Sequence, residues 1–298
     1  MKLLIITQSV DSEDSILGFF VRWIEEFSKH TESVEVICLR EGRHALPANV
    51  HVHSLGKERG VSRLRYILDF YTSIWRLHHD YDTVFVHMNP EYIVLAGWWW
   101  RLSHKRISLW YMHKSVNLTL RIAAFFANII FTGSKESFRL QSKKVQVMGH
   151  GIDTDFFSPD SSVTRGGWAL SVGRLTKSKR HDLAIRLAKQ ENRALRIAGE
   201  GPERPALEAL AHELGAQVQF LGGLTQVQLR DEYRQAAYLI HTSETGSLDK
   251  VVLEALACGL PVRTNDAALK ALENEGPSYV RAHHSLQNLI PAIIEALS

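Results

Sequence analysis

The sequence predicts an α/β protein made of two Rossmann-like domains that face each other across a cleft. Its 298 residues are enough for two domains of roughly 150 residues each. Short apolar runs of strand length alternate with longer segments whose apolar residues recur at helical spacing. The alternation stops in the polar segment 151–167 and then starts again. We therefore expect an N-terminal domain at residues 1–152 and a C-terminal domain at residues 153–298.

Apolar runs predict the strands of the first domain. They are "KLLIIT" (2–7), "VEVICL" (34–39), "VHVHSL" (50–55), "TVFVHM" (83–88), "RISLWYMH" (106–113), "IIFTGS" (129–134) and "VQVMGHG" (145–151). Between the first two, residues 18–30 carry aromatic and aliphatic side chains near positions i, i+3, i+4, i+7 and i+8 of a helix. Strands that are apolar on both faces, with helices between them, are typical of a parallel sheet covered on both sides.

The second domain repeats this pattern. Its predicted strands cover 168–173, 194–199, 218–222, 237–243 and 261–265, and its predicted helices cover 181–190, 203–215, 228–236 and 248–258. A final helical segment, 286–297, can pack back on the first domain. Rossmann-like domains bind ligands at the carboxyl ends of their strands, so this fold predicts a ligand in the cleft without naming its chemistry.

The composition excludes several classes of protein. Hydrophobic residues make up 45% of the chain and charged residues 22%, as in an ordinary soluble globular protein. Cys38 and Cys258 stand far apart without CxxC spacing, which indicates a reducing compartment. The first apolar run is too short for a signal peptide, and no stretch approaches the ~20 apolar residues of a membrane span. We expect a cytoplasmic protein.

The net charge of +3 is unevenly distributed. Residues 1–149 carry 19 Lys and Arg against 14 Asp and Glu, whereas residues 150–298 carry 16 against 18. The mildly basic first half suits an anionic or membrane-bound partner, but +5 is too little to indicate nucleic acid. The segment "GWWWRLSHKR" (97–106) also sets tryptophans beside cations, as at the inner face of a membrane. We favour the alternative, a buried helix followed by a solvated turn.

Motifs for common cofactors do not occur in the sequence. There is no GxxxxGK[ST], no GxGxxG after the first strand and no Cys/His cluster with zinc spacing. Asp80 and Asp82 form an Asp-x-Asp that the end of a helix explains better than a metal site. His87 follows a strand, where an acceptor-binding role and a satisfied strand-end histidine fit equally well. We therefore expect neither a metal nor another cofactor.

The loop after the strand 168–173 is rich in cations. It holds Arg174, Lys177, Lys179 and Arg180. Cations at the carboxyl end of a strand can clamp a diphosphate, and arginine can bind two phosphate oxygens at once. A solvated basic turn explains the same residues about as well.

The stretch "SETGSLDKVVLEALACGLPV" (243–262) predicts a loop, a helix with a glycine stop, and a strand. Ser247 suits the N-cap of the helix 248–258, and the free amides at such an N-terminus attract phosphate. Lys250 and Glu254 are four residues apart on this helix. An exposed ion pair worth ~0.3 kcal/mol is therefore the alternative to a ligand-binding role.

Several motifs together resemble the retaining GT-B glycosyltransferases of glycosyltransferase family 4. In the second half, "VGRLTKSKRHD", "IAGEGPERPALEALAHELG", "FLGGL" and "GSLDKVVLEALACGLPV" look like that family's donor-binding domain. "MGHGIDTDFFSP" resembles its interdomain segment, and "ILGFF" with "LWYMHKSVNLTLRIAAFFANIIFTGSKESF" resembles its acceptor domain. The likeness covers most of the chain and is stronger in the second half.

The resemblance implies roles for residues of the second domain. Arg174 and Lys179 match the cations that bind the donor diphosphate, and Glu254 matches the glutamate that hydrogen-bonds the ribose. The backbone that would cap the phosphates belongs to Asp249, Lys250 and Val251. Gly199 and Leu224 lie on the side of the base.

In the first domain, the resemblance implies two further site residues. His113 matches a catalytic histidine near the reacting carbon of the donor sugar. Gly18 matches a glycine that lets the diphosphate lie close to this domain.

The sequence departs from the family pattern on the side of the donor sugar. The family has a glutamate eight positions before Glu254, where this chain has Gly246. We expect either that Glu244 or Asp249 reaches in, or that backbone groups of Gly246, Ser247 and Leu248 suffice.

The implied reaction transfers a sugar, with retention, from a nucleoside diphosphate sugar to the hydroxyl of a sugar or a lipid-linked acceptor, without a metal. A bacterial polysaccharide or glycolipid pathway fits this resemblance. Two alternatives stay open: another GT-B nucleotide-sugar enzyme, such as an epimerase or a hydrolase, and a non-catalytic nucleotide-sugar-binding partner of another transferase. The base, the sugar, the acceptor and the oligomeric state do not follow from the sequence.

Overall fold

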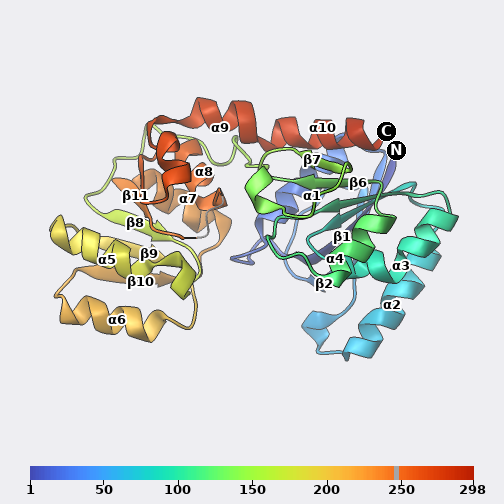
Figure 1. Cartoon of the computed structure of the whole chain (residues 1–298), viewed down its shortest axis with the longest axis horizontal. Helices are drawn as coiled ribbons and strands as arrows, with labels where there is room; N and C mark the ends of the chain where they lie inside the picture. The colour runs from blue at the N-terminus through green and yellow to red at the C-terminus, as the bar shows by residue number, and fades with distance from the viewer. Residues whose placement is uncertain (245–247) are drawn as a thin grey trace. The chain divides into compact units, whose positions relative to one another are not determined.

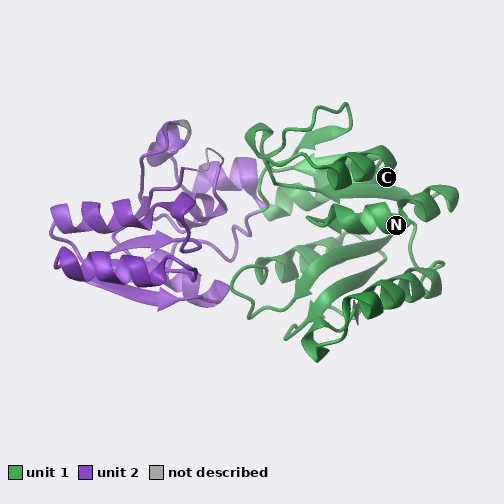
Figure 2. Cartoon of the chain, turned by 60° about the horizontal axis from the view of Figure 1, so that its bottom comes forward, with its two compact units in different colours: residues 1–151, 286–298 green, residues 152–285 purple. Residues whose placement is uncertain are grey.

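The computed structural model describes residues 1–244 and 248–298, apart from the side chain of Ala268. The chain forms two compact units, Met1–Gly151 with Leu286–Ser298, and Ile152–Ser285 (Figure 2). The boundary between the units lies between residues 151 and 152, whereas the sequence predicts it between residues 152 and 153. The last helix belongs to the first unit. Each unit is a parallel sheet covered by helices (Figure 1), so the prediction of an α/β chain with two Rossmann-like domains is confirmed.

The sheet of the first unit has the order β3-β2-β1-β4-β5-β6-β7. Its strands are β1 (Lys2–Val10), β2 (Ser33–Glu41), β3 (Val50–Ser54), β4 (Thr83–His87), β5 (Arg106–Trp110), β6 (Ile129–Thr132) and β7 (Val145–Val147). All neighbouring strands pair in parallel. The direction of winding reverses between β1 and β4, so the loops that follow these two strands open at one switch point.

Alternate residues of β1 point into two separate cores. Leu4 and Ile6 pack with α2 (Arg63–Arg76), α3 (Pro90–Leu102) and α4 (Leu118–Phe126). Leu3 and Ile5 pack with α1 (Phe19–Lys29) and α10 (Leu286–Leu297) on the opposite face. The last helix therefore completes the core of the first unit. Two short 3₁₀ helices, η1 (Lys57–Arg59) and η2 (Lys135–Ser137), complete this unit.

The sheet of the second unit has the order β10-β9-β8-β11-β12. Its strands are β8 (Ala169–Val172), β9 (Leu195–Ala198), β10 (Val218–Gly222), β11 (Tyr238–His241) and β12 (Val262–Thr264). One face is covered by α5 (His181–Gln190) and α6 (Arg204–Glu213). The other is covered by α7 (Gln226–Gln235), α8 (Lys250–Ala257), η4 (Ala267–Asn274) and α9 (Pro277–His284), and η3 (Lys177–Lys179) precedes α5. Here the winding reverses between β8 and β11.

Two helix starts differ from the sequence expectation. A capping box between Thr225 and Gln228 starts α7 two residues before the predicted position. Helix α8 starts at Lys250, with Asp249 as its N-cap, and not near Leu248. Asp249 has extended backbone angles, and Ser247, the expected N-cap, lies outside the described residues.

The two cysteines are buried in different units and neither forms a disulfide. Within the described part of the chain, no helix is long and apolar enough to cross a bilayer.

Buried His181, the first residue of α5, makes the stability of the second unit sensitive to acid. Burial lowers the pKa of His181 from 6.5 to about 4, against a smaller opposing effect of the backbone at Arg174 and Gly173. The unfolded chain therefore takes up a proton at higher pH than the folded chain, and stability falls as the pH drops from 6.5 towards 4.

We expect His181→Asn to flatten this acid dependence. The asparagine amide can replace the Nδ1 contact with Ser171 Oγ, which is 3.0 Å long. The shift corresponds to a loss of at most about 3 kcal/mol of unfolding free energy between pH 6.5 and pH 4 in the native protein. Urea unfolding at several pH values measures it, and equal slopes for both proteins over that range would contradict the assignment.

Candidate functional site

The loops after β8 and β11 meet at the switch point of the second unit. The hydroxyl of Thr242 donates to the carbonyl oxygens of Lys179 and Arg180, at 3.0 and 2.9 Å. The amide of Glu244 donates to the carbonyl of Ser178 at 3.0 Å. Because ligands of open α/β sheets bind at such a switch point, we expect a binding site at these loops.

A partly buried charge network joins these loops. Asp249 Oδ2 accepts from Lys179 Nζ at 2.6 Å and from His241 Nε2 at 3.0 Å. Nδ1 of His241 in turn lies 3.0 Å from the hydroxyl of Thr264. Burial alone would raise the pKa of Asp249, but the His241 hydrogen bond and the Lys179 ammonium lower it to about 2. Asp249 is therefore an anion at neutral pH and neutralises Lys179.

Asp249 does not cap its own helix. Its side chain makes no hydrogen bond to the first amides of α8, although aspartate at an N-cap normally does. Because the carboxylate is turned towards Lys179, the positive end of α8 lies beside an existing ion pair. The sequence predicts for Asp249 a backbone that caps the phosphates or a side chain that reaches the donor sugar, but not this ion pair with Lys179.

The four cations of the loop after β8 do not gather at one point. Arg174 is exposed, and its side chain makes no ion pair or hydrogen bond within the described residues. Lys179 points to Asp249, whereas Lys177 and Arg180 line a pocket on the side of α6. A single clamp made of all four side chains is therefore not what the structure shows.

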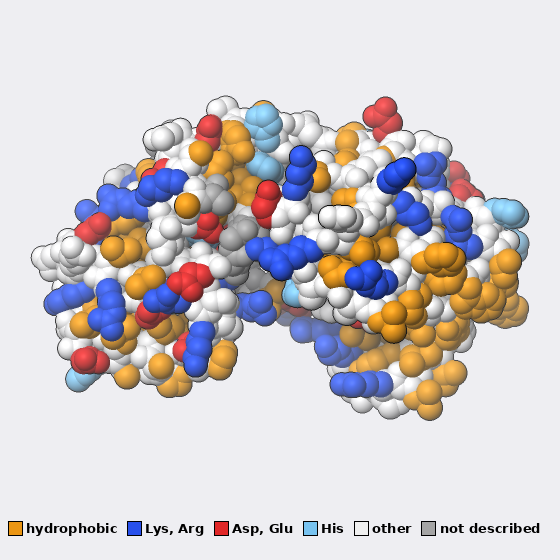
Figure 3. Space-filling model, in the orientation of Figure 1, with side chains coloured by type: hydrophobic (Ala, Val, Ile, Leu, Met, Phe, Trp, Pro, Cys, Tyr) orange, Lys and Arg blue, Asp and Glu red, His pale blue; other side chains and the backbone are white. Residues whose placement is uncertain are grey.

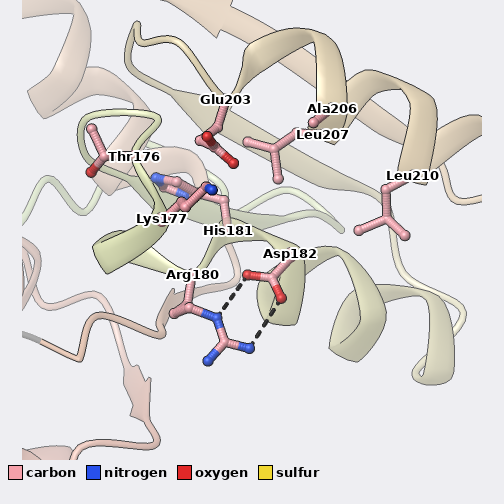
Figure 4. Close-up of a pocket in the computed structure, with 9 residues that line it drawn as sticks. All are labelled: Thr176, Lys177, Arg180, His181, Asp182, Glu203, Ala206, Leu207 and Leu210. Atoms are coloured by element: carbon pink, nitrogen blue, oxygen red, sulfur yellow. Dashed lines mark hydrogen bonds and ion pairs between the residues drawn. The ribbon is translucent and has the colours of Figure 1, made fainter.

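The pocket beside α6 has a volume of about 400 Å³ (Figure 4). It is lined by Thr176, Lys177, Arg180, His181, Asp182, Glu203, Ala206, Leu207 and Leu210. Arg180 forms two hydrogen bonds to Asp182, at 3.0 and 3.1 Å, and also pairs with Glu244. The Arg180 charge is therefore satisfied by two carboxylates.

Glu254 is 2% exposed and lies one turn after the start of α8. Oε2 accepts from the hydroxyl of Tyr233 at 3.1 Å, and Oε1 lies 3.2 Å from Lys250 Nζ. The ion pair that the spacing predicts exists, but the expectation of an exposed pair is wrong for Glu254. A buried carboxylate is costly unless it is bonded, so this one indicates a structural or ligand-binding role.

Gly199 follows β9 and has a structural reason to be glycine. A Cβ atom at this position would lie 1.9 Å from the carbonyl oxygen of Gly173, at a φ of +144°. Any side chain would push apart the loops that follow β8 and β9. Leu224, the other residue predicted on the base side, is partly buried and packs on the core under α7 and α8.

The residues expected beside the donor sugar are only partly described. Glu244 is exposed and pairs with Arg180, while Leu248 and Val251 both pack against the core that contains the buried residues of α8. Gly246 and Ser247 lie outside the described residues. What takes the place of the family glutamate at position 246 stays a prediction.

The first unit holds the two remaining predicted site residues. Gly18 is buried at the start of α1, and a Cβ there would lie 2.5 Å from the carbonyl oxygen of Asp14. His113 is exposed after β5, and its Nδ1 accepts from the amide of Ser115 at 3.1 Å. A neutral His113 therefore carries its proton on Nε2, which faces away from this turn.

His87 fits the structural alternative. It is 3% exposed, stacks on Phe20 with ring centroids 3.9 Å apart, and contacts Thr7 through Nδ1 at 3.2 Å. His241, which binds Asp249, and Tyr233, which binds Glu254, are by contrast two residues that the sequence did not predict. The only signal for His241 was its place at the end of a strand at the switch point.

Residues 157–276 match the family model described as glycosyl transferases group 1. The chain is 33% identical over 136 residues to D-inositol 3-phosphate glycosyltransferase of Mycobacteroides abscessus, covering 40% of this chain and 31% of that protein. It is 29% identical over 170 residues to a GDP-mannose-dependent alpha-mannosyltransferase of Mycobacterium tuberculosis, covering 54% and 42%. The matches thus span between about a third and two fifths of the length of these curated relatives.

Solved structures with this fold cover nearly the whole chain. The Anabaena HepE complex with UDP and glucose aligns with a TM-score of 0.65 and 17% identity, over 100% of this chain and 90% of that one. UDP-GlcNAc 2-epimerase of Methanocaldococcus jannaschii aligns with a TM-score of 0.59 and 11% identity, over 99% of both chains. At this identity the likeness shows the fold alone, which is the GT-B fold.

Proposed function

The second unit belongs to the glycosyl transferases group 1 family, and on this premise we propose that the chain transfers a sugar from a nucleoside diphosphate sugar to an acceptor hydroxyl. The observation that carries the proposal is the switch point between β8 and β11. There the cation of Arg174, the Lys179–Asp249 pair and the start of α8 belong to two adjoining loops. This combination suits a diphosphate.

The chemistry that we propose rests on charge at the leaving group. When the bond between the sugar and the diphosphate breaks, negative charge grows on the diphosphate oxygens. Arg174 and Lys179 stabilise this charge more in the transition state than in the ground state, which lowers the barrier. Asp249 holds Lys179 in place through a 2.6 Å contact, so little reorganisation is needed during the reaction. These cations act here in place of a divalent metal.

We propose the following roles for the other predicted residues, as the family resemblance implies them. Glu254 accepts from the ribose hydroxyls, and Gly199 and Leu224 lie near the base. Gly18 keeps the first unit free of a side chain near the phosphates, and His113 offers an Nε2–H to the sugar. Glu244, the backbone near Leu248, or both contact the donor sugar. We propose that the anomeric configuration is retained, by departure and attack on the same face.

The donor and the acceptor are proposed as classes. The mannosyltransferase among the relatives is named for GDP-mannose, and the HepE structure contains UDP, so both bases are candidates. The acceptor that we propose is a sugar or lipid-linked sugar of a bacterial polysaccharide or glycolipid, made on the cytoplasmic side of the membrane.

A thermal-shift screen followed by a turnover assay tests the proposal. Nucleoside diphosphates and their sugars of the three bases uridine, guanosine and adenosine should raise the melting temperature selectively, because a ligand that binds only the folded state stabilises it. The best donor is then incubated with acceptor panels, and the released nucleoside diphosphate is measured. An absence of any stabilisation by all of these ligands would contradict the proposal.

An epimerase or hydrolase is the second candidate, since an epimerase shares the fold over 99% of the chain. The same donor incubated without an acceptor separates the two. An epimerised sugar nucleotide or free sugar would favour this candidate, whereas transfer that requires an acceptor would favour the transferase. Tight donor binding without turnover on any acceptor would indicate a non-catalytic partner.

A further inference from the structure

Helix α2 carries two apolar stripes and buries only one of them. Phe70 and Ile74 lie in the core beneath the helix. A second stripe faces solvent with exposed fractions of 68% at Leu64, 54% at Leu68, 37% at Tyr71 and 73% at Trp75. These four residues are spaced i, i+4, i+7 and i+11, so they form one continuous line along the helix. A helix that only covers a core does not need this second stripe.

The neighbouring helices extend the exposed apolar surface. On α3, Trp98 is 49% and Leu102 is 70% exposed, four residues apart. On α4, Leu118 and Phe125 are more than two thirds exposed. The preference for a buried helix over "GWWWRLSHKR" is thus correct for Trp100 and wrong for Trp98, because α3 has one buried and one exposed face.

Helices α2 and α3 frame a groove within this surface. The groove has a volume of about 520 Å³ and is lined by Tyr71, Thr72, Ile74, Trp75, Trp98 and Trp99. Tyr71 Oη and Trp98 Nε1 both donate to the carbonyl of Leu95, at 3.0 and 3.1 Å, which fixes the two rings side by side. Figure 3 shows the apolar side chains gathered over α2 and α3, with Lys and Arg beside them. We call Leu64, Leu68, Tyr71, Trp75, Trp98 and Leu102 the α2–α3 surface.

The region around this surface has a positive net charge. Residues 57–144, which include α2, α3 and α4, hold 14 Lys and Arg against 6 Asp and Glu, a net charge of +8 in a chain whose total is +3. Arg63 at the start of α2, Arg101 beside Leu102, and Arg121 between Leu118 and Phe125 are exposed. Among the described residues none of these three arginine side chains has an ion pair. Their charge is therefore available to an anionic partner.

We propose that the α2–α3 surface docks on a lipid bilayer that contains anionic lipids. Exposed tryptophan, tyrosine and leucine beside arginine match the composition of segments that lie in the interface of a membrane. Apolar side chains enter the boundary of the acyl region, and Arg63, Arg101 and Arg121 meet the lipid phosphates. A second copy of this chain fits less well, because two regions that each have a net charge of +8 would repel each other.

Vesicle flotation tests this proposal without relying on the glycosyltransferase assignment. The full chain is floated with vesicles of phosphatidylcholine alone and of phosphatidylcholine with an equal amount of phosphatidylglycerol. We expect binding to the anionic vesicles that weakens as salt is added, because the electrostatic part is screened. Absence of binding to both kinds of vesicle at low salt would overturn the proposal.

Two matched variants locate the contact. Trp75→Ser with Trp98→Ser removes two exposed rings and should lower the vesicle partition coefficient at least about tenfold, since both rings would lose their apolar burial in the bilayer. Leu187→Ser with Val227→Ser removes two apolar side chains that are 41% and 49% exposed in the second unit, and should leave binding unchanged. Equal binding by both variants, each with a native melting temperature, would overturn the proposal.

The alternative occupants give different results. If the α2–α3 surface joined two copies of the chain, sedimentation would show a dimer that the Trp75/Trp98 variant dissociates, and vesicles would not compete with it. If it bound a protein, the wild-type chain would not float with protein-free vesicles. Either result would overturn the lipid assignment, and neither bears on whether the chain transfers sugars.

Discussion

Arg174→Ala should lower kcat by a factor on the order of 10²–10³ while the protein keeps its native melting temperature. Arg174 is exposed and has no partner within the described residues, so its loss leaves no buried group unsatisfied. The effect belongs to the transition state, in which charge grows on the leaving diphosphate. Steady-state kinetics with a saturating donor, alongside thermal unfolding, measures both quantities.

Lys177→Ala is the matched control for Arg174. Lys177 lies three residues away in the same loop and is also exposed, but it lines the pocket beside α6. If the loop acts only through its total charge, both variants lose activity equally. If Arg174 binds the diphosphate, Lys177→Ala keeps its rate within a few-fold of the native protein. A native rate for Arg174→Ala would remove this residue from the proposed clamp.

The strands of both sheets could be predicted because each is a short apolar run between segments whose apolar residues have helical spacing. Every predicted strand overlaps one of β1 to β12, and the predicted range of α5 matches the structure at both ends. The motif loops could be placed for the same reason, since they follow β8 and β11 directly. Parallel winding then brings Lys179 and Asp249 together although they are 70 positions apart.

The hydrogen-bond partners of the site side chains could not be predicted, because they depend on which polar groups from other elements the fold places beside them. Sequence spacing predicted the ion pair between Lys250 and Glu254. It did not predict the hydrogen bond that Glu254 accepts from the Tyr233 hydroxyl, because Tyr233 belongs to α7. It placed Asp249 near the phosphates or the donor sugar, but it did not predict that His241 and Lys179 bind the Asp249 carboxylate. The exposed stripe of α2 escaped for a related reason: apolar residues at helical spacing do not show which of them meet the core and which face solvent.

Glu254→Gln should weaken the binding of nucleoside diphosphates at least about tenfold. Hydrogen bonds from ribose hydroxyls to a carboxylate are stronger than bonds to an amide, by about 1.5 kcal/mol or more for two hydroxyls. Glu254 is buried beside Tyr233 and Lys250, so its orientation is set before any ligand binds. Glu254→Ala should in addition lower the free energy of unfolding by about 2–4 kcal/mol, because Tyr233 and Lys250 lose their shared partner.

A cycle with the ligand separates the ribose contact from these structural effects. Titration calorimetry compares a ribonucleoside diphosphate with its 2′,3′-dideoxy analogue on the native protein and on Glu254→Gln. If the carboxylate binds the ribose hydroxyls, the dideoxy analogue binds the native protein weakly. Its affinity then falls almost no further in Glu254→Gln. If Glu254 contacts only Tyr233 and Lys250 and not the ribose, Glu254→Gln weakens the binding of both ligands by the same factor. Tyr233→Phe is the control, since it removes one internal bond of Glu254 and leaves the carboxylate and its Lys250 contact in place.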